Sequence, residues 1–491
     1  MSQENLLVLV TLLAYKLVLV GVGFWASRRT HSESDFFIAG QGLGAWVAGL
    51  SYAASTSSAW VLLGFSGFVY ASGLSALWMV PGIWGGYAAV WLFFGRRLRE
   101  ETAERGHVTL TDFAAAGANE NMKRLIAITA SLFIVFCFVF YIAAQFGAAA
   151  SAFETQFALP ATEAVLLGAG VVLLYAILGG FWAVSVTDML QGFLMLLVAV
   201  LLPAFAFYSA GGVSGISAAL ANNTPPDYLD PMGGMGLFLF LGFVLGLWGV
   251  GIGAMGQPHL LARLMAVKDE ASRKRGFLIA TGWAVLVYIG MATMALSGRA
   301  LLGGGLNGEA LFYQLANDLL PPILAGIVIA AILSAIMSTV DSILLSASAA
   351  VSHDMRLVKV WPGHEVLISR LTMVAITAIA IWMTLVLPAT IFDRVLFAWA
   401  ALGAAFGPIV VMRVLRFEPA GWAVLSAMIA GFGLTVAFNA LGQVPEGSAG
   451  GVLAALRGLA VLPGDPFERV FPWVPALLLL WLGSTGRRAN N

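Results

Sequence analysis

Seven polar side chains interrupt one apolar stretch of the chain, and one of them is a carboxylate. The stretch is residues 331–350, AILSAIMSTVDSILLSASAA. Asp341 matters most, because a carboxylate at the centre of a bilayer costs roughly 2.5–3.5 kcal/mol on insertion scales. Such a group persists where it faces a cavity, a partner or a cation. A carboxylate among hydroxyls is a hard-oxygen environment, which suits Na⁺ or a proton and not a soft metal.

The spacing of these residues places several of them on one helical face. Ser338, Asp341 and Ser342 are related as i, i+3 and i+4, and Ala335 and Thr339 extend the same face. Their hydroxyls, together with carbonyls freed by a broken helix, would supply the oxygen ligands of a Na⁺ site. A hydroxyl in a membrane helix also bonds its own i−4 carbonyl. The prediction therefore depends on the cluster and not on any single hydroxyl.

A second carboxylate occurs in the phrase GGFWAVSVTDMLQGF. Asp188 is either a helix-end residue at the membrane interface or a cation ligand or relay. In the second interpretation it lies across a cavity from Ser338, Asp341 and Ser342.

Other residues within apolar runs have polar or aromatic groups that suit the wall of a solute cavity. They are Trp60, Tyr141, Trp248 and Gln257. Aromatic rings in membrane spans also serve as interfacial anchors or packing groups. We expect His259 to be structural and Arg263 to be an anchor of the positive-inside type.

The composition indicates a polytopic membrane protein. The 491 residues are 60% hydrophobic and 10% charged, whereas soluble domains carry about 25% charged residues. The net charge is zero and gives no indication of nucleic-acid binding. The single cysteine, Cys137, excludes an internal disulfide and a cysteine metal cluster. No nucleophile–base set, metal-ligand cluster or Walker motif is visible, so we expect no enzyme, and active transport would be ion-driven.

Apolar runs of about 20 residues predict membrane spans, and the chain contains thirteen. They cover residues 4–26, 43–70, 74–95, 123–152, 160–179, 182–208, 233–260, 276–299, 319–350, 366–387, 391–413, 420–441 and 470–485. The first has no basic region before it and no small-residue cleavage site, so we expect a retained helix.

The distribution of basic residues predicts the orientation. With thirteen spans, twenty of the twenty-five Lys and Arg residues fall on one side and four on the other, and Lys16 lies within the first span. Basic loops stay in the cytoplasm. We therefore expect the N-terminus outside and the C-terminus in the cytoplasm.

Two spans have sequences that favour an interrupted helix. The span at 43–70 has a polar centre from Ser51 to Ser58, and the span at 233–260 has glycines at 242, 246, 249, 251, 253 and 256 and then Pro258. They begin two blocks of five helices, 43–208 and 233–413. Interrupted helices at matching places in two halves are typical of inverted-repeat transporters. Alternatively, the glycines only allow close helix packing.

Five phrases, in order, resemble the solute:sodium symporter family, and within it most closely the bacterial sodium/proline members. They are FFIAGQGLGAWVAGLSYAAS, GGFWAVSVTDMLQ, GQPHLLARLMA, SAIMSTVDSILLSASAAVSHD and FAWAALGAAFGPIVV. The resemblance implies an all-α membrane protein of about thirteen transmembrane helices with a LeuT-type 5+5 inverted repeat, one extra N-terminal helix and two extra C-terminal helices. The corresponding regions are a peripheral helix and loop at 1–42, repeats at 43–208 and 233–413, an extracellular loop at 209–232 and two helices at 414–491.

The resemblance also implies which residues bind ions and solute. The family's principal sodium site corresponds to carbonyls of Ala54, Ser57 and Ala335 and hydroxyls of Ser338 and Thr339. A second sodium position, present in some members, corresponds to Asp188 with Ser338, Asp341 and Ser342. The solute region corresponds to Thr56, Ser58, Trp60, Tyr141, Ala254, Gln257 and Pro258.

Three positions depart from the proline carriers. Thr56 stands where they have an Asp, and Asp341 stands where they have a Ser. We hypothesise that the carboxylate has moved across the site with its charge conserved. Val250 and Ala254 replace a Trp and a Tyr, which enlarges or depolarises the pocket and puts proline in question.

The implied activity is Na⁺-coupled import of a small amino or imino acid, with proline as the first candidate, by alternating access in a bacterial plasma membrane. The alternatives are proton coupling, another small solute such as betaine or a carboxylate, or a transporter-fold sensor or channel. The expected partners are the solute, Na⁺ and the lipid bilayer; no organic cofactor, nucleic acid or oligomer is required.

Overall fold

The structure is a computed structural model that describes residues 17–19, 21–22, 25, 33–157, 159–177, 180–356, 361, 364–387, 390–448 and 450–484. Within these ranges the chain forms helices and no strand, which confirms the prediction of an all-α protein. The predicted first span, 4–26, lies mostly outside the described residues.

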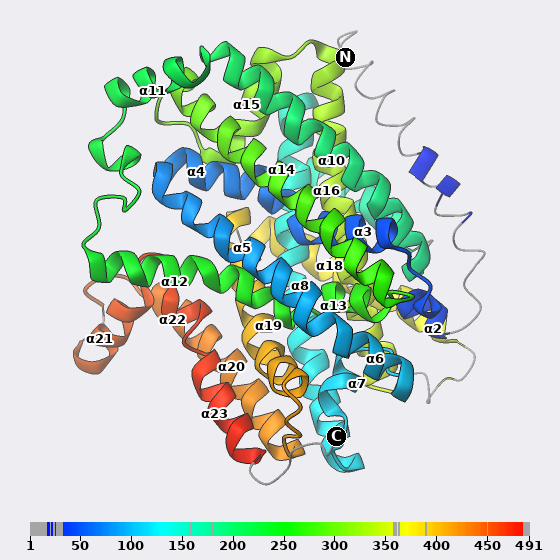
Figure 1. The fold of residues 1–491 in the computed structure, drawn as a ribbon. Coiled ribbons are helices and arrows are strands. Elements are labelled where there is room, and N and C mark those ends of the chain that lie inside the picture. The colour runs from blue at the N-terminus through cyan, green and yellow to red at the C-terminus, as the bar shows by residue number, and fades with distance from the viewer. Residues whose placement is uncertain are drawn as a thin grey trace.

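The helices follow one another through short connections (Figure 1). The first half contains α2 (Glu33–Ile38), α3 (Ala45–Ala59), α4 (Ser66–Ser72), α5 (Met79–Ala88), α6 (Gly95–Arg105), α7 (Leu110–Ala115), α8 (Glu120–Phe157), α9 (Ala161–Ala176), α10 (Phe181–Ser209) and α11 (Gly212–Asn223). The second half contains α12 (Leu237–Gly253), α13 (Pro258–Met265), α14 (Glu270–Leu302), α15 (Leu311–Leu319), α16 (Pro322–Ala349), α18 (Glu365–Val386), α19 (Ile391–Val414), α20 (Gly421–Gly442), α21 (Gly451–Ala460), α22 (Pro466–Arg469) and α23 (Trp473–Gly483).

Nine helices in the described part of the chain are long and apolar enough to cross a bilayer, compared with thirteen predicted spans. The difference has three sources. The predicted spans 43–70 and 74–95 form one helical run, Ala45–Arg105. The helices α9 and α23 have 16 and 11 residues, so they are shorter than a full span. The first predicted span is the one outside the described residues.

Both spans predicted to be interrupted are interrupted. Ser58 in α3 has a φ of 48° and a ψ of −171°, which no helix accommodates. The amide of Trp60 donates to Ser58 Oγ at 3.0 Å, and the amide of Ala59 donates to Gln145 Oε1 at 3.2 Å. In the second span the extended Gln257 (φ −86°, ψ 110°) separates the turn at Ala254–Gly256 from α13. Side chains therefore satisfy backbone amides that the first break frees.

The core is built around α16, which packs against α3, α8 and α10. Its residues from Val328 to Leu345 are buried, including every polar one. The helices α10 and α14 approach so closely that a Cβ at Gly290 would overlap the carbonyl of Ala199. Small residues permit such close packing between membrane helices. Here the close packing holds α10 against α14 and α3.

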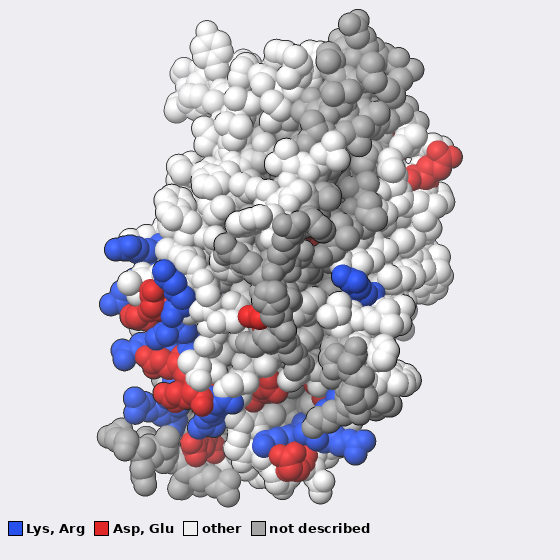
Figure 2. Space-filling model, turned by 90° about the vertical axis from the view of Figure 1, so that its right-hand side faces the viewer, with Lys and Arg blue, Asp and Glu red and all other residues white. Residues whose placement is uncertain are grey.

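Charged side chains gather at one end of the molecule. Figure 2 shows most of the coloured Lys, Arg, Asp and Glu residues of this face at its lower end, with few of them above. The helix α6, at the lower end of Figure 1, contributes Arg96, Arg97, Arg99 and Arg105. This concentration agrees with the uneven distribution of basic residues along the sequence.

Candidate ion and solute site

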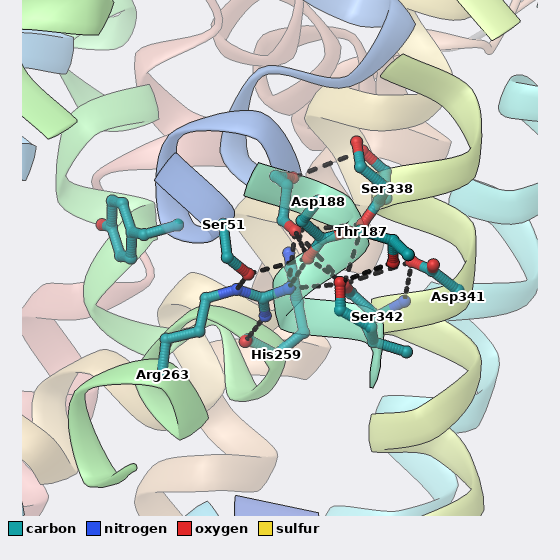
Figure 3. Close-up of polar contacts among 12 residues, drawn as sticks. Ser51, Thr187, Asp188, His259, Arg263, Ser338, Asp341 and Ser342 are labelled. Carbon is teal, nitrogen blue, oxygen red and sulfur yellow. Dashed lines mark hydrogen bonds and ion pairs between the residues drawn. The ribbon is translucent and has the colours of Figure 1, made fainter. Parts of the chain in front are cut away.

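Four helical segments bring buried polar groups together beside the break in α3. Ser51 and Ser55 come from α3, Asp188 from α10, Arg263 from α13 and Ser342 from α16 (Figure 3). All five residues are at most 2% exposed. The break in the second interrupted span makes this meeting possible, because α13 turns back towards α3 and α16 after Gln257.

Arg263 is the centre of this network. Its Nη2 lies 2.7 Å from Asp188 Oδ2, 2.7 Å from Ser55 Oγ and 2.6 Å from Ser342 Oγ. Its Nε donates to Ser51 Oγ at 2.7 Å, and its Nη1 donates to the carbonyl of His259. Because Nη2 carries two hydrogens and faces three oxygens, only two of these contacts are hydrogen bonds at one time.

The prediction that Arg263 is an anchor at the membrane surface is wrong, because its side chain is fully buried. A signal for this burial exists in the sequence. Arg263 stands among Leu260, Leu261, Leu264 and Met265, and the polar residue that shares its face of the short helix is His259, four positions earlier.

Within the described residues Arg263 pairs with one of the two carboxylates, Asp188, and Asp341 has no ion pair. Asp188 Oδ2 accepts from Ser51 at 2.7 Å, besides its ion pair with Arg263. Asp188 Oδ1 and Asp341 Oδ2 are buried and have no hydrogen-bond partner within the described ranges. Asp341 Oδ1 accepts only from Ser342, through its amide at 2.7 Å and its hydroxyl at 3.4 Å. With both carboxylates ionised the cluster has a formal charge of −1, and a buried uncompensated charge is costly.

The structure brings residues of α16 that were predicted as ligands together with Asp188. This agrees with the interpretation of Asp188 as a cation ligand or relay that faces Ser338, Asp341 and Ser342. Ser342 Oγ lies 3.5 Å from Asp188 Oδ2, and Ser55 Oγ donates to the carbonyl of Ser338 at 3.0 Å. Sequence reasoning did not single out Ser51 and Ser55. Their i, i+4 spacing in the polar centre of the first interrupted span was the available signal.

The predicted principal sodium residues lie where α3 and α16 meet. Thr339 Oγ1 donates to the carbonyl of Ala335 at 3.0 Å and lies 3.4 Å from the carbonyl of Ser55. Ser338 Oγ donates to the Ala335 carbonyl at 3.1 Å. Ala54 and Ser57 are buried on the facing helix, and Ser57 Oγ has no partner among the described groups. The atoms that these residues offer as ligands are all oxygen atoms, which fits a hard monovalent cation such as Na⁺.

An apolar and aromatic cavity of about 20 Å³ lies beside the break. Four predicted residues line it: Thr56, Trp60, Tyr141 and Ala254. Val250, predicted to border the pocket because it replaces an aromatic residue of the proline carriers, also lines it. The remaining lining residues were not predicted, and they are Ile83, Tyr87, Gly251, Tyr288, Val395, Leu396 and Trp399. The Trp60 ring stacks on Phe392 at the start of α19, at a centroid distance of 5.8 Å.

The other predicted solute residues lie around this cavity. Ser58 Oγ lies 3.4 Å from the hydroxyl of Tyr141. The Gln257 amide donates to the carbonyls of Gly253 and Trp399 at 3.1 and 2.9 Å, so it joins α12 to α19. Pro258 begins α13 and lines a separate small cavity. Trp248 is 41% exposed and bonds the Trp78 carbonyl, so its predicted place in the cavity wall is wrong.

Comparison with known proteins gives one consistent result. A family model described as the sodium:solute symporter family matches residues 36–431. The high-affinity proline transporter PutP of Bacillus subtilis is 33% identical over 419 residues, which cover 84% of this chain and 87% of that protein. The sodium/proline symporter of Escherichia coli is 33% identical over 446 residues and 86% of each chain.

Solved structures show the same fold at low sequence identity. A Na⁺-coupled sialic acid symporter, solved in a substrate-bound outward-open state, aligns with a TM-score of 0.75 and 17% identity over 96% of this chain and 98% of its own. The nucleobase-cation symporter Mhp1 in a closed conformation aligns with a TM-score of 0.54 and 13% identity over 92% and 95%. The fold is therefore of the LeuT type.

Proposed function

The chain belongs to the sodium:solute symporter family, and from that premise we propose that it imports a small zwitterionic amino or imino acid together with Na⁺. Proline is the first candidate, because the relatives from Bacillus subtilis and Escherichia coli are proline carriers by name. The activity is transport and not enzymatic catalysis.

The observation that carries the proposal is the unbalanced charge beside the break in α3. Arg263 pairs with Asp188, Asp341 has no ion pair within the described ranges, and each carboxylate retains one oxygen without a partner among the described groups. One further monovalent cation neutralises the cluster. We propose that Asp188, Ser338, Asp341 and Ser342 hold this cation, and that Ala54, Ser57, Ala335, Ser338 and Thr339 hold a Na⁺ in the neighbouring principal site.

Bound Na⁺ would couple the ion to the solute through the contact of α3 with α16. The cation ligands come from both helices, so binding favours the conformation in which the two helices are held together. The same break in α3 borders the solute cavity through Trp60 and Thr56. Na⁺ therefore raises the affinity for solute, and solute raises the affinity for Na⁺ by the same factor.

The cavity wall supports a solute without net charge. No charged side chain is among the residues that line it, and most of them are aromatic or aliphatic. A carboxylate or a cation would be desolvated there without a counter-charge, whereas a zwitterion can place its carboxylate at the freed backbone of a broken helix. At about 20 Å³ the cavity holds no more than one or two water-sized probes. Solute binding therefore requires Trp60 and its neighbours to move apart.

We propose that the end with α6 and α7 faces the cytoplasm of a bacterial plasma membrane, since basic residues gather there. The N-terminus would then lie outside and the C-terminus inside. Na⁺ enters with the membrane potential, which supplies about 2.3 kcal/mol per charge at 100 mV. Each chain has its own ion and solute site, so transport does not require an oligomer.

Proton coupling through Asp188 or Asp341 is the rival within the same class, because a proton would also neutralise the cluster. The deciding experiment is uptake into proteoliposomes with an imposed Na⁺ gradient, using proline, other small amino acids, betaine and short carboxylates. We expect proline or a close analogue to accumulate, and accumulation to stop when choline replaces Na⁺ at fixed pH. Uptake that continues in choline and follows a pH gradient would refute Na⁺ coupling.

A further inference from the structure

A second cluster of ligating groups lies at the α6–α7 end, away from the ion and solute site. Asp112 is in α7, and His353 and Asp354 end the π-helical turn Ala350–Asp354 that follows α16. One ligand atom of each residue lies within 4.8 Å of those of the other two. Asp112 Oδ2 and His353 Nε2 are already 3.2 Å apart, close to the separation of two ligands on one metal ion with bonds of about 2.0–2.2 Å.

The carboxylates of this cluster are held in place by groups around them. The Thr109 hydroxyl donates to Asp354 Oδ1 at 2.8 Å. The amides of Val108 and Thr109 donate to Asp112 Oδ2 at 3.0 and 3.2 Å. Such outer contacts orient the ligands of protein metal sites. They are present here because Thr109 and Asp112 form the capping box of α7.

An independent observation points to a ligand at this place. The cluster borders a cavity of about 510 Å³. Thr111, a residue that is 2% exposed, also borders this cavity, with its hydroxyl beside the Asp354 carboxylate. Water in the cavity can complete a coordination shell.

Three cationic residues line the cavity, and each has an ion-pair partner outside the cluster. Arg105 pairs with Glu101 at 3.5 Å. Lys123 and Arg356 both pair with Glu120, at 3.0 and 3.2 Å, and both are at least 40% exposed. Exposed charges are screened by water and salt. Asp112 and Asp354 share one imidazole, so the cluster has a formal charge of −2 with neutral histidine. A divalent cation would neutralise it.

We infer that Asp112, His353 and Asp354 bind a divalent first-row transition metal ion, of the class of Zn²⁺. One imidazole and two carboxylates suit Zn²⁺ or its neighbours, whereas Mg²⁺ and Ca²⁺ prefer oxygen ligands alone. The bound ion would join α7 to the end of α16, the helix that carries Asp341. This site does not depend on the proposed transport activity.

The test is Zn²⁺ binding to the purified full chain in detergent, with an affinity tag that contains no histidine. Zn²⁺ is titrated against a chromogenic chelator, and thermal unfolding is followed with and without Zn²⁺. We expect one Zn²⁺ per chain, a higher midpoint of unfolding with Zn²⁺, and no competition from excess Mg²⁺. The His353→Gln and Asp354→Asn variants lose both effects. The His364→Gln variant removes a histidine outside the cluster and retains them.

The wild-type titration decides the matter even if a variant fails to fold. Absence of Zn²⁺ binding by the wild-type chain overturns the inference. Binding that survives unchanged in a folded His353→Gln variant overturns it as well, because the metal would then lie elsewhere. Displacement of Zn²⁺ by Mg²⁺ would overturn the assignment to a transition metal.

Discussion

Substitution of Asp341 by Asn gives the sharpest test of the charge imbalance at the ion site. It removes one negative charge with little change of shape, and it leaves Asp188 and Arg263 as a neutral pair. A cation about 4 Å from the lost carboxylate gives up about 4 kcal/mol of attraction at an effective dielectric constant of about 20. That loss corresponds to roughly a thousandfold in affinity. We therefore expect Asp341→Asn to abolish ion-coupled uptake.

Thr56→Ala is the matched comparison, because Thr56 holds the position where the proline carriers have a carboxylate. Its hydroxyl donates to the Tyr52 carbonyl within α3 at 2.6 Å. Loss of one neutral hydrogen bond costs about 1 kcal/mol, so we expect weaker uptake and not its loss. Ser334→Ala is the control on α16, because it removes a buried hydroxyl from the same helix, one that donates to the Ala330 carbonyl at 2.7 Å, and it changes no charge.

Two measurements on these variants separate ion binding from transport. The first is uptake of radiolabelled proline into proteoliposomes with an imposed Na⁺ gradient. The second is the midpoint of thermal unfolding as Na⁺ replaces choline at constant ionic strength, which requires no knowledge of the solute. Equal and mild effects of Asp341→Asn and Thr56→Ala in both assays would refute the idea that the functional carboxylate has moved to Asp341.

Three further predictions concern stability. Arg263→Gln leaves the buried carboxylate of Asp188 without its ion-pair partner and should lower the free energy of unfolding by about 3–5 kcal/mol. Asp188→Asn should lower it less, because the cluster then has no net charge. Chemical denaturation of the double variant should show a loss smaller than the sum of the two single losses, and additivity would contradict a direct ion pair. Gly251→Ala would drive a Cβ into a backbone carbonyl of α5 and should reduce the yield of folded protein in size-exclusion chromatography. In the control variant Gly242→Ala, on the same helix, the new Cβ meets nothing within 4 Å and the yield should not fall. Equal yields of the two variants would contradict the close packing of α12 against α5. Burial raises the pKa of Glu309, so the folded chain holds that proton to higher pH than the unfolded chain does. Its contribution to stability is fully present below about pH 4.3 and is lost as the pH rises through the folded pKa; thermal midpoints of Glu309→Gln measured against pH should lack this decline, and an unchanged profile would refute the assignment.

Much of the fold was predictable because membrane helices obey local rules. Length and apolarity predict the spans, and each of the nine span-length helices in the described part of the chain overlaps a predicted span. The short helices between them, such as α7 and α11, were not predicted. The interruption at Ser58 was predictable from its run of hydroxyls, and the one at Gln257 was predictable from glycines followed by Pro258. Helical periodicity placed Ser338, Asp341 and Ser342 on one face before any tertiary contact was known.

The role of Arg263 was not predictable by the same rules. The positive-inside rule assigns a basic residue to the cytoplasmic surface when it lies close to the end of a membrane span. Arg263 lies close to the end of the predicted span 233–260, so the rule places it at the surface. The rule does not consider the direction of a short helix after a break. The position of α13 is decided by Gln257, which bonds α12 and α19. Only this arrangement brings Arg263 to Asp188, 75 residues away in the chain.

The sequence alone therefore determined that the protein is a bundle of membrane helices, two of them broken, with hydroxyls and carboxylates buried at membrane depth. These properties depend on hydropathy and on residues a few positions apart. The tertiary structure decided which buried charges meet, and it left Asp188 and Asp341 with one guanidinium between them. Pairing of charges depends on how distant helices pack, and neither composition nor periodicity contains that information.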